Sequence, residues 1–483
     1  MDSMNVSRPH LTVAQAGEDA HLPGGLADCT GSLTELGGGL AHRVALAALL
    51  ASTLAPEEGS PLSGQALGGD LRLSREAVHK QVKQLRSLGF AVEAVPRVGY
   101  RLNEPFSDLV VPEAVLPYLF GLVGKGRQAI RKEVAELHRA EACSEVGAKG
   151  GSGQEGVRTL ASSRGSSALG VGVPYHYLTE CRSTNAVARE LVAKSPSGTV
   201  IVTDRQTGGR GRLGRSWLSE SGKDLTFSVI LRPALTPAQA QLLSLAAAVA
   251  VAEVLEERFG LQGRVGLKWP NDVLLEGRKV CGVLVEGSLD VDHLHWVVVG
   301  IGLNVNSQAS RLPASARAAG LDHHSPDLAG QETLPSNSGP EAKEWQGRPQ
   351  PIALGEYLGR RVERAVLLAA LLARLGDRFA SVEKPAGLLA AWRARDVLVG
   401  RLVEVTTSRG ALVVSGTAEG LGPQGQLLVR ETVPVKESGL ARESVSVKES
   451  DVEQSRRGPG AEGRVIQVFA GDVSVLGLPT VEV

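Results

Sequence analysis

The sequence predicts an α+β protein of several domains: a helical N-terminal part, a central mixed α/β part and a C-terminal part made of short strands. The chain has 483 residues, which exceeds what one hydrophobic core usually organises and suits about three domains. The apolar periodicity changes along the chain from helical to mixed and then to short strands. Stretches rich in Gly, Ser and Pro separate these parts and are typical of linkers and insertions.

The N-terminal part predicts a winged helix-turn-helix over residues 41–104, after a disordered, Gly- and Ser-rich tail at 1–40. Leu73 and Ser74 form the turn, and Ser74 caps a second helix at residues 75–88. Residues 91–102 suit a two-stranded wing. The second helix turns Ala77, Val78, Val82 and Leu85 inward. Its outward side chains fit the phosphates and base edges of a major groove. We therefore predict DNA contacts from Ser74, Arg75, His79, Lys80 and Lys83.

A linker is predicted at residues 105–173, with a charged helix at 127–142 and a low-complexity insertion rich in Gly and Ser. The central domain then spans 174–396. Strand-like apolar runs alternate there with helical patterns, which predicts a mixed α/β fold. The strands are expected at 199–203, 225–231, 280–285 and 296–301, and helices at 237–259 and 354–379. Residues 307–350 lack periodicity and are predicted to be an insertion.

The C-terminal residues 397–483 predict a small β-barrel. Short strands alternate there with glycines. The strands are expected at 401–406, 411–418, 426–431, 465–469 and 473–476. A charged, Ser-rich insertion at 434–463 interrupts this series.

Composition excludes several classes of protein. Lys plus Arg and Asp plus Glu both number 52, so any contact with nucleic acid must come from a local patch. The N-terminus lacks a secretory signal pattern, and the longest apolar run, residues 242–255, is too short for a membrane span. The cysteines are isolated, which favours free thiols over metal ligands or disulfides. We therefore predict a cytoplasmic protein with no membrane partner and no protein-bound metal. The cysteines are Cys29, Cys143, Cys181 and Cys281.

The segment QTGGRGRLGRSW at residues 206–217 is the most informative motif. Its glycines allow positive φ angles and a close approach of the backbone to a ligand. Arg210, Arg212 and Arg215 add permanent positive charge. The pattern predicts a loop that encloses a bound phosphate or carboxylate. A solvated basic turn or a nucleic-acid-binding segment is the alternative.

A second motif, KWPND at residues 268–272, is followed by RKVCG at 278–282. The turn Glu276-Gly277 predicts a β-hairpin between them. Lys268 and Lys279 flank this hairpin, so both ammonium groups are expected at one pocket. Two ordinary surface lysines are the alternative.

Two further motifs are weaker when each is taken alone. GIGLNVN at residues 300–306 ends an apolar strand, and alternation places Gly302 and Asn304 on one face. A glycine there offers a flat surface for a ring, and the Asn304 amide can bond the polar edge of that ring. Ser183, Thr184 and Asn185 open a helix. They suit either helix capping or recognition of a small polar head group.

Taken together and in this order, these motifs resemble those of the biotin–protein ligase family, in the bifunctional class where a biotin-operon repressor domain precedes the ligase. The resemblance covers nearly all of the chain except the tail and three insertions. It implies a biotin/lipoyl-ligase-type catalytic domain in the centre and an SH3-like barrel at the C-terminus. It also identifies the N-terminal winged helix as a repressor domain.

The resemblance implies roles for individual residues. The catalytic cations are Lys279, Arg210 and Arg212. Biotin is held by the same three residues together with Ser183, Thr184, Asn185, Gln206 and Gly211. The nucleotide is contacted by Lys268, Asp272 and Asn304.

The implied reaction joins biotin and ATP into biotinyl-5′-adenylate and then transfers biotin to a lysine of a biotin carboxyl carrier protein. Two anions must meet in the first step, so cations are required around them. Mg²⁺ bridging the phosphates is expected to assist. Operator DNA and a second copy of the chain, forming a homodimer, are the other expected partners.

Three other functions remain open at this point. The chain could be a DNA-binding biotin sensor with an inactive ligase domain, a lipoate-type protein ligase, or a ligase without repressor activity. Retention of the loop arginines and Lys279 argues against the first, and the Arg-Gly-Arg loop followed by KWPND favours biotin over lipoate.

Overall fold

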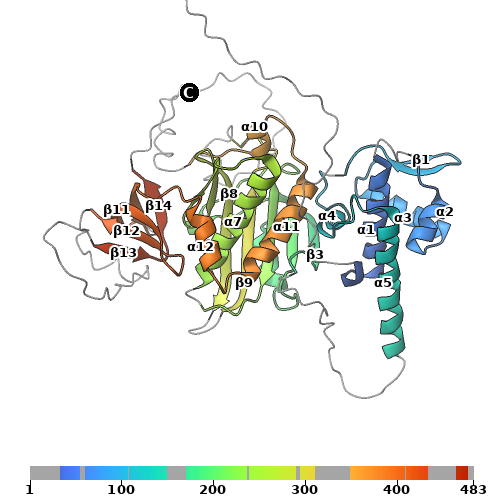
Figure 1. The fold of residues 1–483 in the computed structure, drawn as a ribbon, viewed down its shortest axis with the longest axis horizontal. Helices are drawn as coiled ribbons and strands as arrows, with labels where there is room; N and C mark the ends of the chain where they lie inside the picture. The colour runs from blue at the N-terminus through green and yellow to red at the C-terminus, as the bar shows by residue number, and fades with distance from the viewer. Residues whose placement is uncertain are drawn as a thin grey trace, which may run out of the picture.

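The structure is a computed structural model, which describes residues 33–54, 60–106, 108–148, 170–236, 239–289, 294–309, 349–407, 410–432 and 464–476. Three bodies follow one another along the chain (Figure 1). The predicted insertion at 434–463, nearly all of that at 307–350, and residues 1–32 of the predicted tail lie outside these ranges. Among the described residues, no helix combines the length and apolarity that crossing a bilayer requires.

The N-terminal body is a helix-turn-helix with a two-stranded wing. Its elements are η1 (Leu33–Glu35), α1 (Gly38–Ala51), η2 (Ser52–Leu54), α2 (Gly64–Leu71), α3 (Arg75–Ser87), β1 (Val92–Val95) and β2 (Gly99–Leu102). Ser63 caps α2 and Ser74 caps α3, each through its hydroxyl, which accepts a backbone N–H three residues on. Val78, Val82 and Leu85 of α3 are fully buried, as the helical spacing predicts.

The predicted disordered tail is wrong for residues 33–40. Leu33 is fully buried in the hydrophobic core, and α1 begins at Gly38. The two glycines that open α1 have low helix propensity, so composition alone suggested a tail where packing forms a helix.

The predicted linker at 105–173 is also wrong for much of its length. It contains α4 (Pro112–Leu119) and α5 (Arg127–Ala148). Ile130, Val134 and Leu137 of α5 are buried in the same core as α1. In addition, the buried Asp70 of α2 accepts hydrogen bonds from Arg127, at 2.6 and 3.0 Å, and from Arg131. The helix therefore packs as part of the N-terminal body, although residues 149–169 of the predicted linker lie outside the described ranges.

The central body is a seven-stranded mixed sheet in the order β3-β4-β5-β9-β8-β7-β6. Only the pair β3 and β4 is parallel. The strands are β3 (Tyr175–Cys181), β4 (Val200–Gln206), β5 (Leu225–Leu231), β6 (Val265–Lys268), β7 (Asp272–Leu275), β8 (Arg278–Leu289) and β9 (Leu294–Leu303). The mixed α/β prediction for this region is confirmed.

Helices cover the two faces of this sheet unequally. The long helices α7 (Ala240–Phe259) and α11 (Arg364–Ala380), with α12 (Ala386–Arg393), lie on one face (Figure 1). On the other face, α6 (Thr184–Leu191) packs on a separate small cluster that includes Ile201, Ile230 and Val298. Because α6 has only eight residues, it leaves part of that face uncovered.

The helix predicted at 354–379 is interrupted in the structure. Gly359 has a φ of 65° and ends α10 (Leu354–Leu358) in a left-handed conformation, and α11 starts afresh at Arg364. A left-handed glycine is a common helix stop, which the apolar periodicity alone does not reveal.

The C-terminal body is an antiparallel sheet in the order β13-β12-β11-β10-β14. Its strands are β10 (Leu402–Thr406), β11 (Leu412–Leu421), β12 (Leu427–Glu431), β13 (Val465–Val468) and β14 (Asp472–Val475). These strands agree with the predicted short strands. Closure of the sheet into an SH3-like barrel stays a prediction, since the described strands give an open order.

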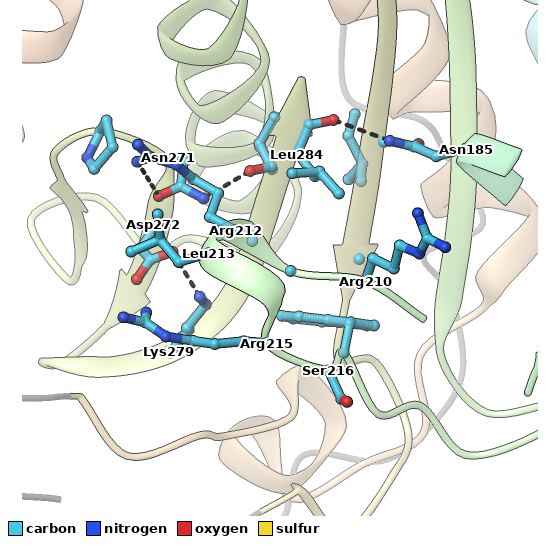
Figure 2. Close-up of a pocket in the computed structure, with 18 of the residues that line it drawn as sticks. Asn185, Arg210, Arg212, Leu213, Arg215, Ser216, Asn271, Asp272, Lys279 and Leu284 are labelled. Atoms are coloured by element: carbon cyan, nitrogen blue, oxygen red, sulfur yellow. Dashed lines mark hydrogen bonds and ion pairs between the residues drawn. The ribbon is translucent and has the colours of Figure 1, made fainter. Parts of the chain in front are cut away.

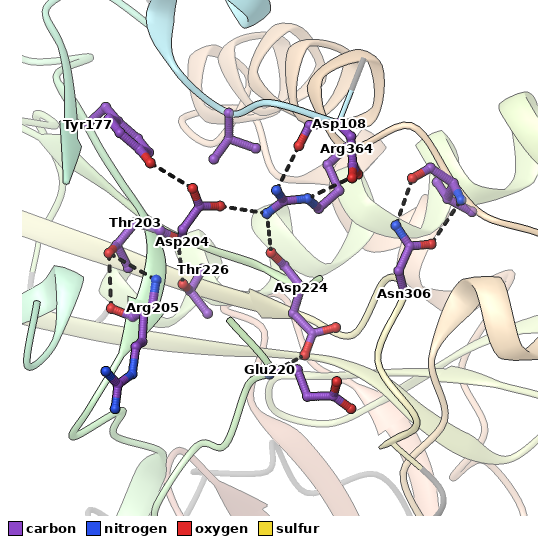
Figure 3. A network of polar contacts seen from close by, with 12 residues as sticks. Asp108, Tyr177, Thr203, Asp204, Arg205, Glu220, Asp224, Thr226, Asn306 and Arg364 are labelled. Atoms are coloured by element: carbon purple, nitrogen blue, oxygen red, sulfur yellow. Dashed lines mark hydrogen bonds and ion pairs between the residues drawn. The ribbon is translucent and has the colours of Figure 1, made fainter. Parts of the chain in front are cut away.

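The buried Arg364 connects the N-terminal body to the central sheet (Figure 3). Its guanidinium donates to the Asp204 carboxylate at 2.8 Å and to the backbone oxygens of Asp108, at 2.6 Å, and Asp224, at 3.3 Å. Asp108 precedes α4, which packs between α1 and α11. Tyr177 donates to the other Asp204 oxygen at 2.6 Å. This network therefore fixes the segment before α4 against the ends of β4 and β5.

We predict that Arg364→Leu destabilises the protein by about 3 kcal/mol, because it leaves buried carbonyl groups without their donor and the Asp204 carboxylate without its cation. Urea unfolding of both proteins measures the difference. Arg361→Leu is the matched control. Its side chain is 73% exposed although it also pairs with Asp108, so a loss below about 1 kcal/mol is expected. Equal losses in the two variants would contradict this account.

Candidate functional site

A cavity lies where the uncovered face of the sheet meets the N-terminus of α6. It has about 870 Å³ of empty space, a volume that includes open solvent. Its walls come from α6, the loop after β4, the β6–β7 turn, β7, β8, β9 and the C-terminal body. The residues that we predicted for the site and that line it are Ser183, Thr184, Asn185, Gln206, Arg210, Gly211, Arg212, Lys268, Asp272 and Lys279.

The floor of the cavity is formed by three glycines on neighbouring strands. Gly282 of β8 lies directly opposite Gly302 of β9, and Gly300 lies two residues along on the same face. A Cβ atom on Gly302 would lie 2.3 Å from the ring of Trp217, and one on Gly300 would lie 2.1 Å from Asn185 Oδ1. The glycines thus make room for both side chains, and the flat surface predicted for a ring carries the indole of Trp217.

The polar end of the cavity is the first turn of α6. Gln206 Oε1 accepts from the backbone N–H of Thr184 at 2.9 Å and from its hydroxyl at 3.2 Å. Asn185 donates through Nδ2 to Glu286 at 2.7 Å. These hydrogen bonds hold the side chains of the polar end in place without a ligand.

The loop after β4 is closed on itself. The backbone N–H of Trp217 donates to the backbone oxygen of Gly209 at 2.9 Å, and the backbone N–H of Gly211 donates to the backbone oxygen of Arg215 at 2.7 Å. Leu213 and Gly214 both have positive φ angles, 59° and 74°. This turn directs the arginines to different parts of the cavity.

Figure 2 shows that separation. Arg210 extends on the side of Asn185, whereas Arg212 lies with Asn271 and Asp272. Arg212 donates to Asn271 Oδ1 at 3.5 Å. The cavity therefore has one cation near the polar end of α6 and a group of cations at the opposite side.

That group of cations is compensated by carboxylates. Lys279 Nζ pairs with Asp272 at 2.6 Å and lies 5.7 Å from the ring centre of Trp217. Burial lowers the pKa of Lys268 and of Arg212, an effect that the charge of Asp272 partly offsets in both. Burial makes the charged forms of these two side chains less favourable, and a bound anion would stabilise them. The site is therefore suited to binding anions.

The C-terminal body supplies the remaining wall. Gly471 and Asp472 line the cavity. Asp472 pairs with Arg215, whose Nη1 lies 3.4 Å from Asp472 Oδ1. Arg215 belongs to the loop predicted at 206–217, whereas no motif around residue 472 predicts this contact between distant parts of the chain.

Asn304 is the predicted site residue that does not line the cavity. It is buried, and its Nδ2 donates to Ile352 O at 3.2 Å. Ile352 N–H in turn donates to Lys279 O at 2.9 Å. Asn304 therefore fixes the segment beside Lys279, and the nucleotide contact predicted for it remains without support from its position.

The predicted DNA-binding side chains lie on the outer face of α3. Arg75, His79, Lys80 and Lys83 are exposed. His79 Nδ1 lies 3.1 Å from the hydroxyl of Tyr100 on the wing. Ser74 is also exposed, but its hydroxyl caps α3. The four side chains form a basic surface beside the wing.

Two features bear on metal and thiol chemistry. Within the described ranges, no three or more His, Cys, Asp or Glu side chains gather in a way that could hold a metal ion. Cys181 and Cys281 are free thiols, and burial raises the pKa of both. Neither thiol lines the cavity.

Comparison with known families decides the assignment of the central body. Residues 177–304 match the model of the biotin/lipoate A/B protein ligase family, and residues 56–101 match that of an HTH domain. The resemblance found in the sequence is confirmed: the ligase-family match lies within the predicted central domain, and the HTH match lies within the predicted N-terminal domain.

Two similar proteins carry both activities in their names. The chain is 29% identical over 381 residues to the bifunctional ligase/repressor BirA of Bacillus subtilis strain 168, covering 78% of this chain and 91% of that protein. It is 33% identical over 253 residues to the protein of the same name from Bacillus spizizenii, covering 52% and 62%. A solved biotin protein ligase from Aquifex aeolicus, in complex with biotin and ATP, is 25% identical, covers 62% of this chain and 97% of its own, and has a TM-score of 0.41.

The contact between Trp217 and the glycine floor yields a prediction. Gly302→Ala should displace the indole, because the added Cβ would lie 2.3 Å from the ring. Near-UV circular dichroism should therefore change in this variant. The change should be absent when Gly302→Ala is made in a Trp217→Phe background. Gly387→Ala in α12, where nothing lies within 4 Å of the added atom, serves as the control. An unaltered spectrum in Gly302→Ala would show that the ring does not rest there.

Proposed function

We propose that this chain is a biotin–protein ligase that also represses transcription in response to biotin. The observation that supports it is one cavity that joins the polar first turn of α6 to Arg210, Arg212, Lys268 and Lys279. The polar turn suits the head group of biotin. The cations suit the carboxylate at the other end of biotin together with the phosphates of ATP.

In the first step, a biotin carboxylate oxygen attacks the α-phosphorus of ATP, and the bond to the β-phosphate oxygen breaks. Biotinyl-5′-adenylate forms and pyrophosphate leaves. Lys279, Arg210 and Arg212 lower the repulsion between the two anions and stabilise the charge that develops in the transition state. Asp272 holds the Lys279 ammonium at the cavity until the phosphates compete for it.

Mg²⁺ fits the donor set of the cavity. Asp272 and Asp472 are carboxylates in its wall, and Mg²⁺ is usually held by one or two carboxylates together with substrate phosphates. These two residues would supply the protein oxygens, and the ion would offset phosphate charge.

In the second step, a lysine amine of a biotin carboxyl carrier protein attacks the carbonyl carbon of the adenylate, and AMP leaves. The mixed anhydride is sensitive to water, so the loop that carries Arg210 and Arg212 should cover it. The C-terminal body, for which we propose an SH3-like barrel, borders the cavity through Asp472. It is therefore placed to meet the carrier.

The repressor activity rests on the basic face of α3. Arg75, His79, Lys80 and Lys83 would contact operator DNA, with Ser74 at the start of the helix. We further propose that the adenylate promotes a homodimer, in which two helix-turn-helix domains bind two half-sites. Sedimentation with and without biotin plus ATP tests this, and a monomer under both conditions would reject it.

The ligase activity is tested by incubating the chain with ATP, labelled biotin and a carrier domain and measuring the label on the carrier. We expect the full chain to label the carrier, and Lys279→Ala to lower the rate about 100-fold or more, since it removes a cation that stabilises the transition state. Lys384→Ala, an exposed lysine outside the cavity, should label as the unaltered protein does. Absence of labelling by the unaltered protein would leave a biotin sensor, and labelling by lipoate instead of biotin would make it a lipoate-type ligase.

A gel shift on the promoter of the biotin genes tests the repressor. We expect a shift that depends on biotin and ATP. Lys80→Ala should weaken binding and reduce the magnitude of the slope of log K against log salt by about two, because each protomer of the proposed dimer loses one phosphate contact. Lys132→Ala, an exposed lysine on α5 away from α3, should leave the slope unchanged. If no shift occurs at any salt concentration, the chain is a ligase without repressor activity.

A further inference from the structure

A chain of hydrogen bonds runs from the polar end of the cavity to the surface through two residues that the reaction above does not use, Ser228 and Glu286. Ser228 Oγ lies 2.7 Å from both Thr184 Oγ1 and Asn185 Oδ1. Asn185 Nδ2 lies 2.7 Å from Glu286 Oε2. Glu286 Oε1 accepts from Arg189 at 3.2 Å. Each atom in this chain therefore has a partner.

The contacts of Asn185 fix which way its amide points. A carboxylate only accepts, so the atom facing Glu286 must be the NH₂ group. The same group lies 3.4 Å from the backbone oxygen of Leu284, which also only accepts. The amide oxygen of Asn185 therefore faces Ser228, in the space that the missing side chain of Gly300 leaves.

Counting protons then settles what Thr184 can offer. Ser228 has one proton, and the amide oxygen of Asn185 can only accept it. The Thr184 proton in turn can go to Ser228 Oγ at 2.7 Å or to Gln206 Oε1 at 3.2 Å, both inside the protein. In either arrangement the hydroxyl of Thr184 has only lone pairs left for a ligand.

We propose that Ser228 and Glu286 are positioning residues that set Thr184 as a hydrogen-bond acceptor, so that the cavity selects a head group that presents N–H. The cyclic urea of biotin has such groups, whereas the dithiolane of lipoate has none. This inference rests on the proposed function and adds to it the feature that separates the two substrate classes of the family.

Burial of these side chains makes the direction of their hydrogen bonds important for ligand binding. Ser228 is fully buried, and Thr184 and Asn185 are 3% and 4% exposed. In such surroundings an unpaired polar group is costly, and a mismatch of donor against donor is not relieved by water. Glu286 lies at the outer end, with 25% of its side chain exposed.

The test begins with Ser228→Ala, assayed by ATP–pyrophosphate exchange driven by biotin. We expect the KM for biotin to rise about tenfold, because Thr184 loses a fixed partner, and the KM for ATP to stay the same. Desthiobiotin keeps both urea N–H groups, so its KM should rise by the same factor. The preference for biotin over lipoate in kcat/KM should fall. Thr226→Val is the control. It removes a buried hydroxyl on the same strand that bonds Thr203 O and does not line the cavity.

Glu286 provides a second pair of variants that does not disturb the core. Glu286→Leu removes the acceptor that orients Asn185, and the KM for biotin should rise as in Ser228→Ala. Glu286→Gln keeps a carbonyl oxygen for the Asn185 amide and should restore most of the affinity for biotin. Recovery in the Gln variant would not occur if Glu286 acted only through its charge.

The outcomes separate this inference from the proposed function. If the unaltered protein fails to exchange with biotin, the proposed function itself fails. If it does exchange, equal changes in the KM for ATP and for biotin, or no change for biotin in both Ser228→Ala and Glu286→Leu, would overturn the inference. An unchanged preference over lipoate in these variants would overturn it as well.

Discussion

The site depends on a stretch of sheet that carries no side chains. Gly282, Gly300 and Gly302 occupy neighbouring positions on one face of β8 and β9, and α6 is too short to cover them. Any side chain at two of these positions would collide with Asn185 or Trp217. The recognition groups can reach the strands only because nothing projects from them. Elsewhere on the same face, Ile230 and Val298 pack under α6 in the ordinary way. One face of one sheet therefore serves as core at one end and as a ligand surface at the other.

Charge compensation is the second condition. Five cations around one cavity would repel one another, yet Asp272 pairs with Lys279, and Asp472 of the C-terminal body pairs with Arg215. Burial still lowers the pKa of Lys268 and Arg212, so the carboxylates offset desolvation only in part. Additional negative charge from substrates is accordingly favourable there. Because Asp472 belongs to a different body, the site is complete only when the C-terminal strands are docked.

Local motifs predicted most of this arrangement, and long-range packing supplied the rest. Residues 206–217 and 268–282 are contiguous, so their glycines and cations point to a site without a structure. Ser228 and Thr226 are the two hydroxyl residues in an otherwise apolar strand, and a buried hydroxyl in such a strand indicates a polar partner. Asp472 carries no such hint, because its role comes only from tertiary contact. The sequence predicts a helix at 127–142, where α5 lies, but not its place in the N-terminal core, because burial of Ile130 or Leu137 against α1 is invisible in a single segment.

The network around Arg364 gives the connection between the bodies a definite position relative to the site (Figure 3). Asp204 lies on β4 two residues before Gln206, and the carboxylate of Asp224 accepts from Val305 N–H at 2.9 Å, one residue after Asn304. Burial raises the pKa of Asp224, and its backbone hydrogen bonds oppose that rise. Arg364 thus contacts the ends of strands that frame the cavity while holding Asp108 before α4. Contacts that connect the N-terminal body to the cavity do not by themselves make one respond to the other. Such coupling requires that the network have a second arrangement, which the protein favours when a ligand is bound. The network does specify which contacts a second arrangement would have to change. If β4 moved relative to α4, the hydrogen bonds of the Arg364 guanidinium to Asp204 and Asp108 would have to change.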